Sequence, residues 1–296
     1  MAMLERFGGI YPALATPLNE DETVDEAGYR RLLRRVLDAG VHGVVVLGSA
    51  GEFTALSDEE KERAIQIVVS EVAGQVPVIA GTGEPGTRRA VAMTRRAAKL
   101  GADAAMVVPP YYSPLSNAGV VAHYRALAEA GDLPVVLYNI PGCTKVTIDL
   151  EVACELAAAP AIIGIKDSGG NFGHFQALVQ QLPAGFTVVT GSDNLLFASL
   201  AVGGSGSIGP GANVAPQWFV GLWNAAKAGR TEEAWEIERR ILAMSAIYRH
   251  GGFHPALKGA LSCLGICKPI VAAPQSPANE TQLQAIGAIL EEVGLL

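Results

Sequence analysis

The sequence predicts an α/β protein, a (β/α)8 or TIM barrel followed by a C-terminal helical extension. Short apolar runs recur along the first two hundred residues, and a helix-like segment closed by glycine or proline follows each of them. Eight such runs can be counted, and most are nearly continuously apolar, as parallel strands covered on both faces are. Eight strands favour a closed barrel over the alternative, an open doubly wound sheet, which often has fewer.

The expected strands, in chain order, are residues 9–16, 43–48, 77–81, 104–109, 134–139, 162–166, 186–191 and 205–209. The segments between them carry helix signals. Residues 57–60, Ser-Asp-Glu-Glu, have the pattern of a capping box, and Gly40, Gly101 and Gly131 stand where glycines end helices. The helix signals therefore fall between the expected strands, as a (β/α)8 barrel requires.

The strand pattern stops after Gly211, and three helix-like stretches follow at residues 217–228, 232–249 and 280–293. We interpret them as helices outside the eight-fold closure. The expected organisation is a barrel catalytic domain over residues 1–225 and a helical extension over residues 226–296.

Composition narrows the function. The chain has 22 Lys+Arg against 29 Asp+Glu, a net charge of −7, and no basic block, so a nucleic-acid partner is not expected. Four unevenly spaced cysteines fit free thiols rather than a disulfide scaffold or a zinc finger. The N-terminal residues lack the apolar core of a signal peptide, and no apolar run reaches membrane-spanning length. We expect a cytoplasmic protein with a small-molecule ligand.

Lys166 is the leading candidate nucleophile. It ends the run Ala-Ile-Ile-Gly-Ile at residues 161–165, so its side chain is expected at the barrel mouth beside aliphatic neighbours. Burial disfavours a charged ammonium, and the free amine is the form that attacks a carbonyl to give a Schiff base. The alternative is a strand-end lysine that extends into solvent. This residue alone does not decide between them.

Other motifs are weaker. Residues 81–86 match GxGxxG, but in the third βα unit rather than the first, so nicotinamide binding is a remote alternative. Residues 203–211 are rich in glycine and could bind phosphate, or could simply leave room for a turn and a substrate. His250 and His254 flank two glycines, which favours a loop with two exposed imidazoles over a metal site. No Ser/His/Asp or metal constellation can be assembled.

Hydroxyl groups stand at three predicted strand ends, at Ser49, at Tyr111-Tyr112 and at Tyr138. Phenols there can relay protons, although aromatic residues at such positions often only pack. Backbone amides at Ser49, Ala50 and Gly51 could bind a carboxylate, or could form only a turn.

Six motifs occur in order along nearly the whole chain: GSAGEF (48–53), GTG (81–83), PPYY (109–112), YNIPG (138–142), IIGIKD (162–167) and GSD (191–193). Together they resemble the dihydrodipicolinate synthase / N-acetylneuraminate lyase family. The resemblance implies a (β/α)8 barrel with a C-terminal helical extension and a class I aldolase mechanism without metal or external cofactor. It also implies a homotetramer built as a dimer of dimers.

The resemblance also implies roles for individual residues. Lys166 would form an imine with pyruvate or a longer 2-oxo acid. Tyr138 would transfer protons, with Ser49 and Tyr112 as its relay, Tyr112 reaching in from a neighbouring subunit. The substrate carboxylate would lie on the amides of the Ser49–Ala50 turn and near Ile208.

Departures from the family pattern bear on the substrate. Cys143 stands where the synthases have an arginine for the carboxylate of aspartate semialdehyde, and a thiol cannot replace a guanidinium. Ala50 replaces a second hydroxyl. Asp193, followed by asparagine, and Pro210 depart from the sialic acid lyase pattern. Lys145 occupies a usual glycine position, where it could bind an anionic group, act on Lys166 electrostatically, or only be solvated.

We therefore expect a lyase that cleaves or forms a C–C bond between pyruvate and an aldehyde. The expected substrate is a 2-keto-3-deoxy sugar acid or 4-hydroxy-2-oxoglutarate. The alternatives are a dehydratase or deaminase using the same lysine imine, a 4-hydroxy-tetrahydrodipicolinate synthase, and a non-catalytic sensor of keto acids. The acceptor aldehyde and the stereochemistry are left open.

Overall fold

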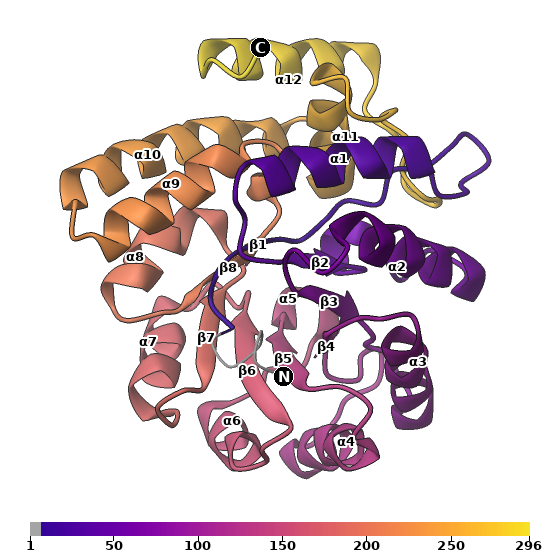
Figure 1. Ribbon diagram of the computed structural model, residues 1–296, viewed down its shortest axis with the longest axis vertical. Helices are drawn as coiled ribbons and strands as arrows, with labels where there is room; N and C mark the ends of the chain where they lie inside the picture. Colours follow the sequence, from indigo (N-terminus) through magenta and orange to yellow (C-terminus); the bar gives the residue numbers. More distant parts are fainter. Residues whose placement is uncertain (1–6) are drawn as a thin grey trace.

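Eight short parallel strands form the centre of the protein in the computed structural model, which describes residues 7–296 (Figure 1). They are β1 Gly9–Pro12, β2 Val44–Val46, β3 Val78–Gly81, β4 Ala104–Val107, β5 Val135–Asn139, β6 Ile162–Asp167, β7 Thr187–Thr190 and β8 Gly206–Gly209. Each falls on a predicted run, and most are shorter than predicted. The eight predicted strands are confirmed.

The strands close into a barrel. Their hydrogen-bonded order is β1-β8-β7-β6-β5-β4-β3-β2. The remaining seam, between β1 and β2, is closed just beyond β1 by a parallel bridge from Ala13 to Val45, beside which the amide of Leu14 donates to the Val45 carbonyl at 2.9 Å. The predicted TIM barrel is confirmed, and the open-sheet alternative is wrong.

Helices surround the strands in a ring (Figure 1). They are α1 Glu26–Asp38, α2 Asp58–Val72, α3 Thr87–Lys99, α4 Asn117–Ala130, α6 Leu150–Ala157, α7 Phe172–Gln181, α8 Leu196–Ala201 and α9 Pro216–Lys227. The short helix α5 Pro141–Thr144 lies inside this ring, after β5 (Figure 1). The predicted cap of α2 is half right. The Ser57 hydroxyl accepts the amide of Glu60, but the Glu60 carboxylate accepts the amide of Val24 instead of completing the box.

The C-terminal part continues with α10 Thr231–Met244, α11 Phe253–Cys263 and α12 Glu280–Glu292, which lie together on one side of the barrel (Figure 1). Two expectations need correction. The helix α9 packs against β1 and α1, so it completes the barrel ring instead of lying outside it, and the predicted boundary at residue 225 falls within it. The expected loop at His254 is the first turn of α11, because Gly252 precedes that helix with φ of 86°.

The carboxyl ends of the strands carry the polar groups. The strands themselves are almost wholly apolar; in β2, for example, all three valines are fully buried. A side chain that follows such a strand is fixed by a rigid element but opens onto the barrel mouth. Ser49 and Asp193 follow β2 and β7 in this way, and Tyr138 and Lys166 are the last residues but one of β5 and β6. No helix within residues 7–296 is long and apolar enough to cross a membrane.

Candidate active site

Lys166 and Tyr138 lie side by side at the barrel mouth. They are register partners on the adjacent parallel strands β6 and β5, so their side chains leave the sheet on the same face. The Lys166 ammonium nitrogen lies 4.0 Å from the centroid of the Tyr138 ring. Only 3% of Lys166 is exposed. The lysine is therefore a buried residue, and the interpretation that it extends into solvent is wrong.

The next residue on each strand holds this register. Asn139 and Asp167 point to the opposite face, where the Asn139 amide donates to the Asp167 carboxylate at 2.6 Å. The amide oxygen of Asn139 also accepts the backbone N–H of Ile148 at 3.0 Å. Both side chains are buried. Neither residue is among the predicted site residues, although Asn139 belongs to the motif YNIPG and Asp167 to the motif IIGIKD.

Ser49 reaches the same place from β2. It begins the 3-10 turn η1 (Ser49–Gly51), and its hydroxyl lies 3.4 Å from the Tyr138 hydroxyl. The first bond within the turn joins the amide of Gly51 to the Gly48 carbonyl, so the amides of Ser49 and Ala50 precede it and are not used by the turn itself. The Gly51 amide is therefore already engaged, contrary to the expectation that it contributes to carboxylate binding.

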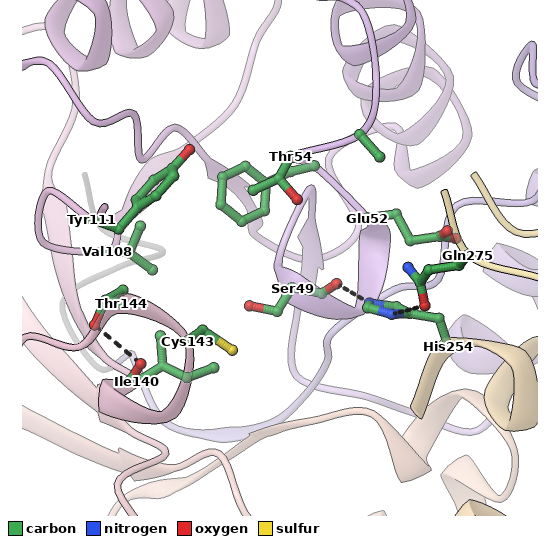
Figure 2. A pocket seen from close by; sticks show the side chains of 12 residues that line it. Ser49, Glu52, Thr54, Val108, Tyr111, Ile140, Cys143, Thr144, His254 and Gln275 are labelled. Carbon is green, nitrogen blue, oxygen red and sulfur yellow. Dashed lines mark hydrogen bonds between the residues drawn. The ribbon is translucent and has the colours of Figure 1, made fainter. Parts of the chain in front are cut away.

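A cavity of about 270 Å³ opens beside Ser49 (Figure 2). In Figure 2 the Ser49 hydroxyl and the Cys143 thiol both point toward the space between them. The complete lining consists of Ser49, Glu52, Phe53, Thr54, Ala55, Val108, Tyr111, Ile140, Cys143, Thr144, His254 and Gln275. Neither arginine nor lysine is among these residues, so Lys166, like Tyr138, lies outside this lining. The wall is mostly apolar, with hydroxyl, thiol, amide and imidazole groups at its polar points.

Asp193 lies beneath the glycine-rich segment that follows β7. One carboxylate oxygen accepts the Gly211 amide at 2.8 Å, and a Cβ at Gly209 would lie 2.1 Å from the other. Burial raises the pKa of Asp193 to about 7, although the Gly211 amide and the charge of Lys166 act in the opposite direction. The glycines thus make room for this carboxyl group. One amide of the proposed phosphate loop is already bound to it.

Two further titratable residues approach Asp193 from the C-terminal part. Burial, with a smaller contribution from Asp193, raises the pKa of Glu238 in α10 to about 7, and Asp193 also acts on the pKa of Tyr248, which burial raises. Glu238 is an acidic residue on the buried face of an amphipathic helix, between Ala234 and Ile241. That spacing is the signal in the sequence from which it could have been found.

Two predicted site residues lie apart from the others, and the role of a third, Ile208, stays a prediction. Tyr112 is 97% exposed and has a positive φ of 79°. Lys145 is exposed, and its ammonium donates to the Gly142 carbonyl of its own short helix at 2.8 Å, outside the cavity lining. Ile208 is fully buried within β8.

His254 and Gln275 join the site although sequence analysis did not place them there. The imidazole Nε2 of His254 lies 2.8 Å from the Ser49 carbonyl oxygen, and its Nδ1 lies 3.0 Å from the Gln275 side-chain oxygen. Both residues line the cavity (Figure 2). The expectation of an exposed imidazole at His254 is therefore wrong.

A second buried lysine, Lys258 in α11, binds the same loop. Its ammonium lies 2.5 Å from the Glu52 carboxylate, and both side chains are almost completely buried. The other Glu52 oxygen accepts the backbone N–H of Ala272 at 2.8 Å. No group of three or more His, Cys, Asp and Glu side chains within the described residues is arranged to hold a metal ion.

The comparisons with known proteins agree over almost the whole chain. The profile of the dihydrodipicolinate synthetase family matches residues 6–293. A 4-hydroxy-tetrahydrodipicolinate synthase of Methanopyrus kandleri is 38% identical over 291 residues, which cover 97% of each chain. The crystal structure of YagE, a family member from Escherichia coli K12 in complex with pyruvate, superposes with a TM-score of 0.94 at 31% identity, covering 98% of this chain and 99% of YagE. A monomeric dihydrodipicolinate synthase variant gives 0.95 at 31% identity, covering 99% of each chain.

Proposed function

Since the chain belongs to the dihydrodipicolinate synthetase family, whose members are lyases of the class I aldolase type that use a lysine–pyruvate imine and no external cofactor, we propose that Lys166 forms this imine. The protein would then make or break a C–C bond between pyruvate and an aldehyde. Its substrate would be a small 2-oxo acid.

One observation carries the proposal: Lys166 is buried at the barrel mouth with an aromatic ring over its nitrogen and no ion-pair partner within residues 7–296. This position places the Lys166 nitrogen where it can attack a carbonyl carbon with a phenol beside it. The Tyr138 hydroxyl, with Ser49 at 3.4 Å, is the proton-transferring group next to it.

The steps follow from these positions. The Lys166 amine attacks the ketone carbon of pyruvate, and the carbonyl oxygen takes up two protons, one given up by the amine and one supplied by an acid, and leaves as water, giving the protonated imine. Loss of a proton from the methyl carbon gives an enamine, whose carbon attacks the aldehyde carbonyl; cleavage is the reverse sequence. Tyr138 donates and accepts the protons of the carbinolamine and of the aldol hydroxyl. The substrate carboxylate binds the free amides of Ser49 and Ala50.

The cavity favours one class of acceptor. Cys143 faces it where a synthase uses arginine, and neither arginine nor lysine lines it, so a carboxylate on the aldehyde would have no cation to pair with. A hydroxyl group, by contrast, can hydrogen-bond with the Thr54 hydroxyl of the lining. A 2-keto-3-deoxy sugar acid, whose aldehyde fragment is hydroxylated, therefore fits better than 4-hydroxy-2-oxoglutarate or aspartate semialdehyde.

Tyr112 supports an assembly of at least two copies. Its ring is almost fully exposed on a backbone of positive φ, and large exposed aromatic rings are typical of interfaces. In a homotetramer built as a dimer of dimers, Tyr112 would extend the hydroxyl relay of a neighbouring subunit. Sedimentation during turnover tests this assignment, because a fully active monomer would contradict it.

Borohydride trapping tests the imine itself. The protein is incubated with pyruvate and borohydride, and intact mass is compared with that of Lys166→Ala and of Lys145→Ala, a matched control at an exposed lysine. We expect one reduced pyruvate adduct per chain, lost only in Lys166→Ala. The same trapping is then repeated with each member of a panel of 2-oxo acids.

The panel separates the remaining alternatives. Release of pyruvate from a 2-keto-3-deoxy sugar acid supports the aldolase. Trapping of such an acid without pyruvate release indicates a dehydratase or a deaminase. An adduct with none of the acids contradicts the proposal and leaves a binding protein without catalysis.

A further inference from the structure

A chain of contacts connects the C-terminal part to the proposed imine lysine. It runs from Gln275 to His254, from His254 to the Ser49 carbonyl, and from the Ser49 hydroxyl to Tyr138. Tyr138 in turn lies over Lys166. Gln275 and His254 both lie more than 200 positions from Ser49 along the chain, and neither belongs to a barrel strand.

The hydrogen at Nε2 of His254 is fixed by its partner. A carbonyl oxygen can only accept, so the 2.8 Å contact with Ser49 requires an N–H at Nε2. At Nδ1, a neutral ring accepts from the Gln275 amide once that amide is turned, and a charged ring donates to its oxygen. Both arrangements keep the Nε2 hydrogen toward Ser49. Gln275 therefore orients the ring in either state.

The bond from His254 to the Ser49 carbonyl matters because the contact from the Ser49 hydroxyl to the Tyr138 hydroxyl is long. A hydroxyl pair is usually 2.7–2.8 Å apart, whereas Ser49 and Tyr138 are separated by 3.4 Å. A shift of the Ser49 peptide by a few tenths of an ångström in one direction closes this contact, and in the other direction breaks it. His254 holds the carbonyl of that same residue.

A separate set of contacts holds the loop as a whole. The Glu52 carboxylate binds Lys258 and the Ala272 amide, and the Thr16 hydroxyl donates to the Gly51 carbonyl at 2.9 Å. These bonds do not pass through His254. Removing the imidazole therefore leaves the loop folded and changes the placement of Ser49.

We propose that His254 is a positioning residue for the imine chemistry, holding Ser49 within reach of the Tyr138 hydroxyl, with Gln275 orienting the imidazole. This inference rests on the proposed function, because it assigns Tyr138 the proton transfers at Lys166. It adds to the site His254, a residue of the C-terminal part that hydrogen-bonds with neither Lys166 nor Tyr138.

Three variants and one control test it. In His254→Ala, the rate of pyruvate trapping and kcat should fall about 10- to 100-fold, the size expected of a misplaced proton-transfer group. The KM for pyruvate should change by less than about threefold, since the binding amides remain. In His254→Gln, a side-chain N–H can again donate to Ser49, so the rate should recover to within about threefold of the wild type. Gln275→Leu should give an intermediate loss. His250→Ala, a histidine outside the cavity lining, should have no effect.

The thermal midpoints of all variants are measured in parallel, because a positioning role leaves them close to that of the wild type. Equal trapping rates in His254→Ala and the wild type would overturn the proposal. So would equal losses in His254→Ala and His254→Gln, or losses that follow a fall in thermal midpoint. A wild-type protein that traps no 2-oxo acid overturns both the imine assignment and this inference, whereas normal trapping with an unaffected His254→Ala overturns this inference alone.

Discussion

Lys166 and Lys258 are both almost completely buried, with 3% and 1% of their surfaces exposed, but their surroundings differ. Lys258 lies 2.5 Å from the Glu52 carboxylate, which draws the two groups into an ion pair. Lys166 faces the Tyr138 ring, and the nearby Asp193 has a pKa raised to about 7 by burial, so below that pH it is largely uncharged.

The comparison shows that burial by itself does not make a lysine a nucleophile. Burial lowers the pKa of Lys258 and the Glu52 charge offsets this only in part, but the Glu52 carboxylate still holds the ammonium in an ion pair. An ammonium held by a carboxylate has no lone pair to attack a carbonyl. We therefore assign Lys258 to holding the loop and Lys166 to the chemistry, and the following experiments address that difference.

Replacing each lysine by methionine should give opposite results. Lys258→Met leaves the Glu52 carboxylate buried without its partner, which should cost about 3–5 kcal/mol of unfolding free energy, measured by urea denaturation. Lys166→Met should abolish trapping and turnover with little loss of stability, since it leaves no ion-pair partner behind. The double variant Lys258→Met with Glu52→Leu should recover most of the lost stability. Similar destabilisation by both single variants would remove the distinction.

Tyr138→Phe tests the group above the first lysine. It keeps the ring over Lys166 but removes the hydroxyl, so kcat should fall by about 10²-fold or more, as for loss of a general acid–base group. The thermal midpoint should stay near that of the wild type. Tyr111→Phe, which alters a phenol that lines the cavity without a described contact to Lys166, is the matched control. Equal kcat values for the two variants would remove Tyr138 from the mechanism.

Glu238→Gln tests the buried carboxyl group next to Asp193. With a pKa raised to about 7, folded Glu238 keeps its proton between about pH 4.5 and 7, while the unfolded chain releases it. Protonation thus favours the folded state, and this contribution is lost as pH rises through that window. The thermal midpoint of the wild type should fall between pH 5 and 8, and the fall should be smaller in Glu238→Gln by a few degrees. Glu236→Gln, at an exposed position of the same helix, should keep the wild-type slope.

Lys145→Ala should have the smallest effect. The ammonium of this exposed lysine binds a carbonyl of its own helix, and surface substitutions of this kind usually change free energies by under about 0.5 kcal/mol. We therefore expect kcat/KM to change by less than about twofold with a sugar-acid substrate. A tenfold loss with an anionic acceptor would instead assign Lys145 to substrate binding.

The barrel and the position of Lys166 were predictable because they depend on local patterns. Most of the apolar runs are nearly continuous, and Lys166 ends one of them, directly beside the strand that ends with Tyr138 and Asn139. In a parallel barrel consecutive strands are neighbours, so these two residues had to meet. The family motifs added Ser49 to them.

The contribution of the C-terminal part was not predictable in the same way. His254 and Lys258 reach the Ser49–Glu52 loop only because α11 packs against it. The two glycines directly before that helix indicate a loop in the sequence, so the start of α11 was not predicted. Glu238 likewise becomes part of the site environment only when α10 packs behind Asp193. Contacts across some 200 residues have no local signature.

The bond from His254 to Ser49 also sets an order in time. During synthesis Ser49 and Glu52 leave the ribosome some 200 residues ahead of the histidine and lysine that bind them. A nascent chain can thus have all eight strands while Glu52 still lacks its counter-ion and the Ser49 carbonyl its donor. On this view a translation product truncated before α11 has reduced activity, and the rise to full activity reports that α11 has been made and has docked.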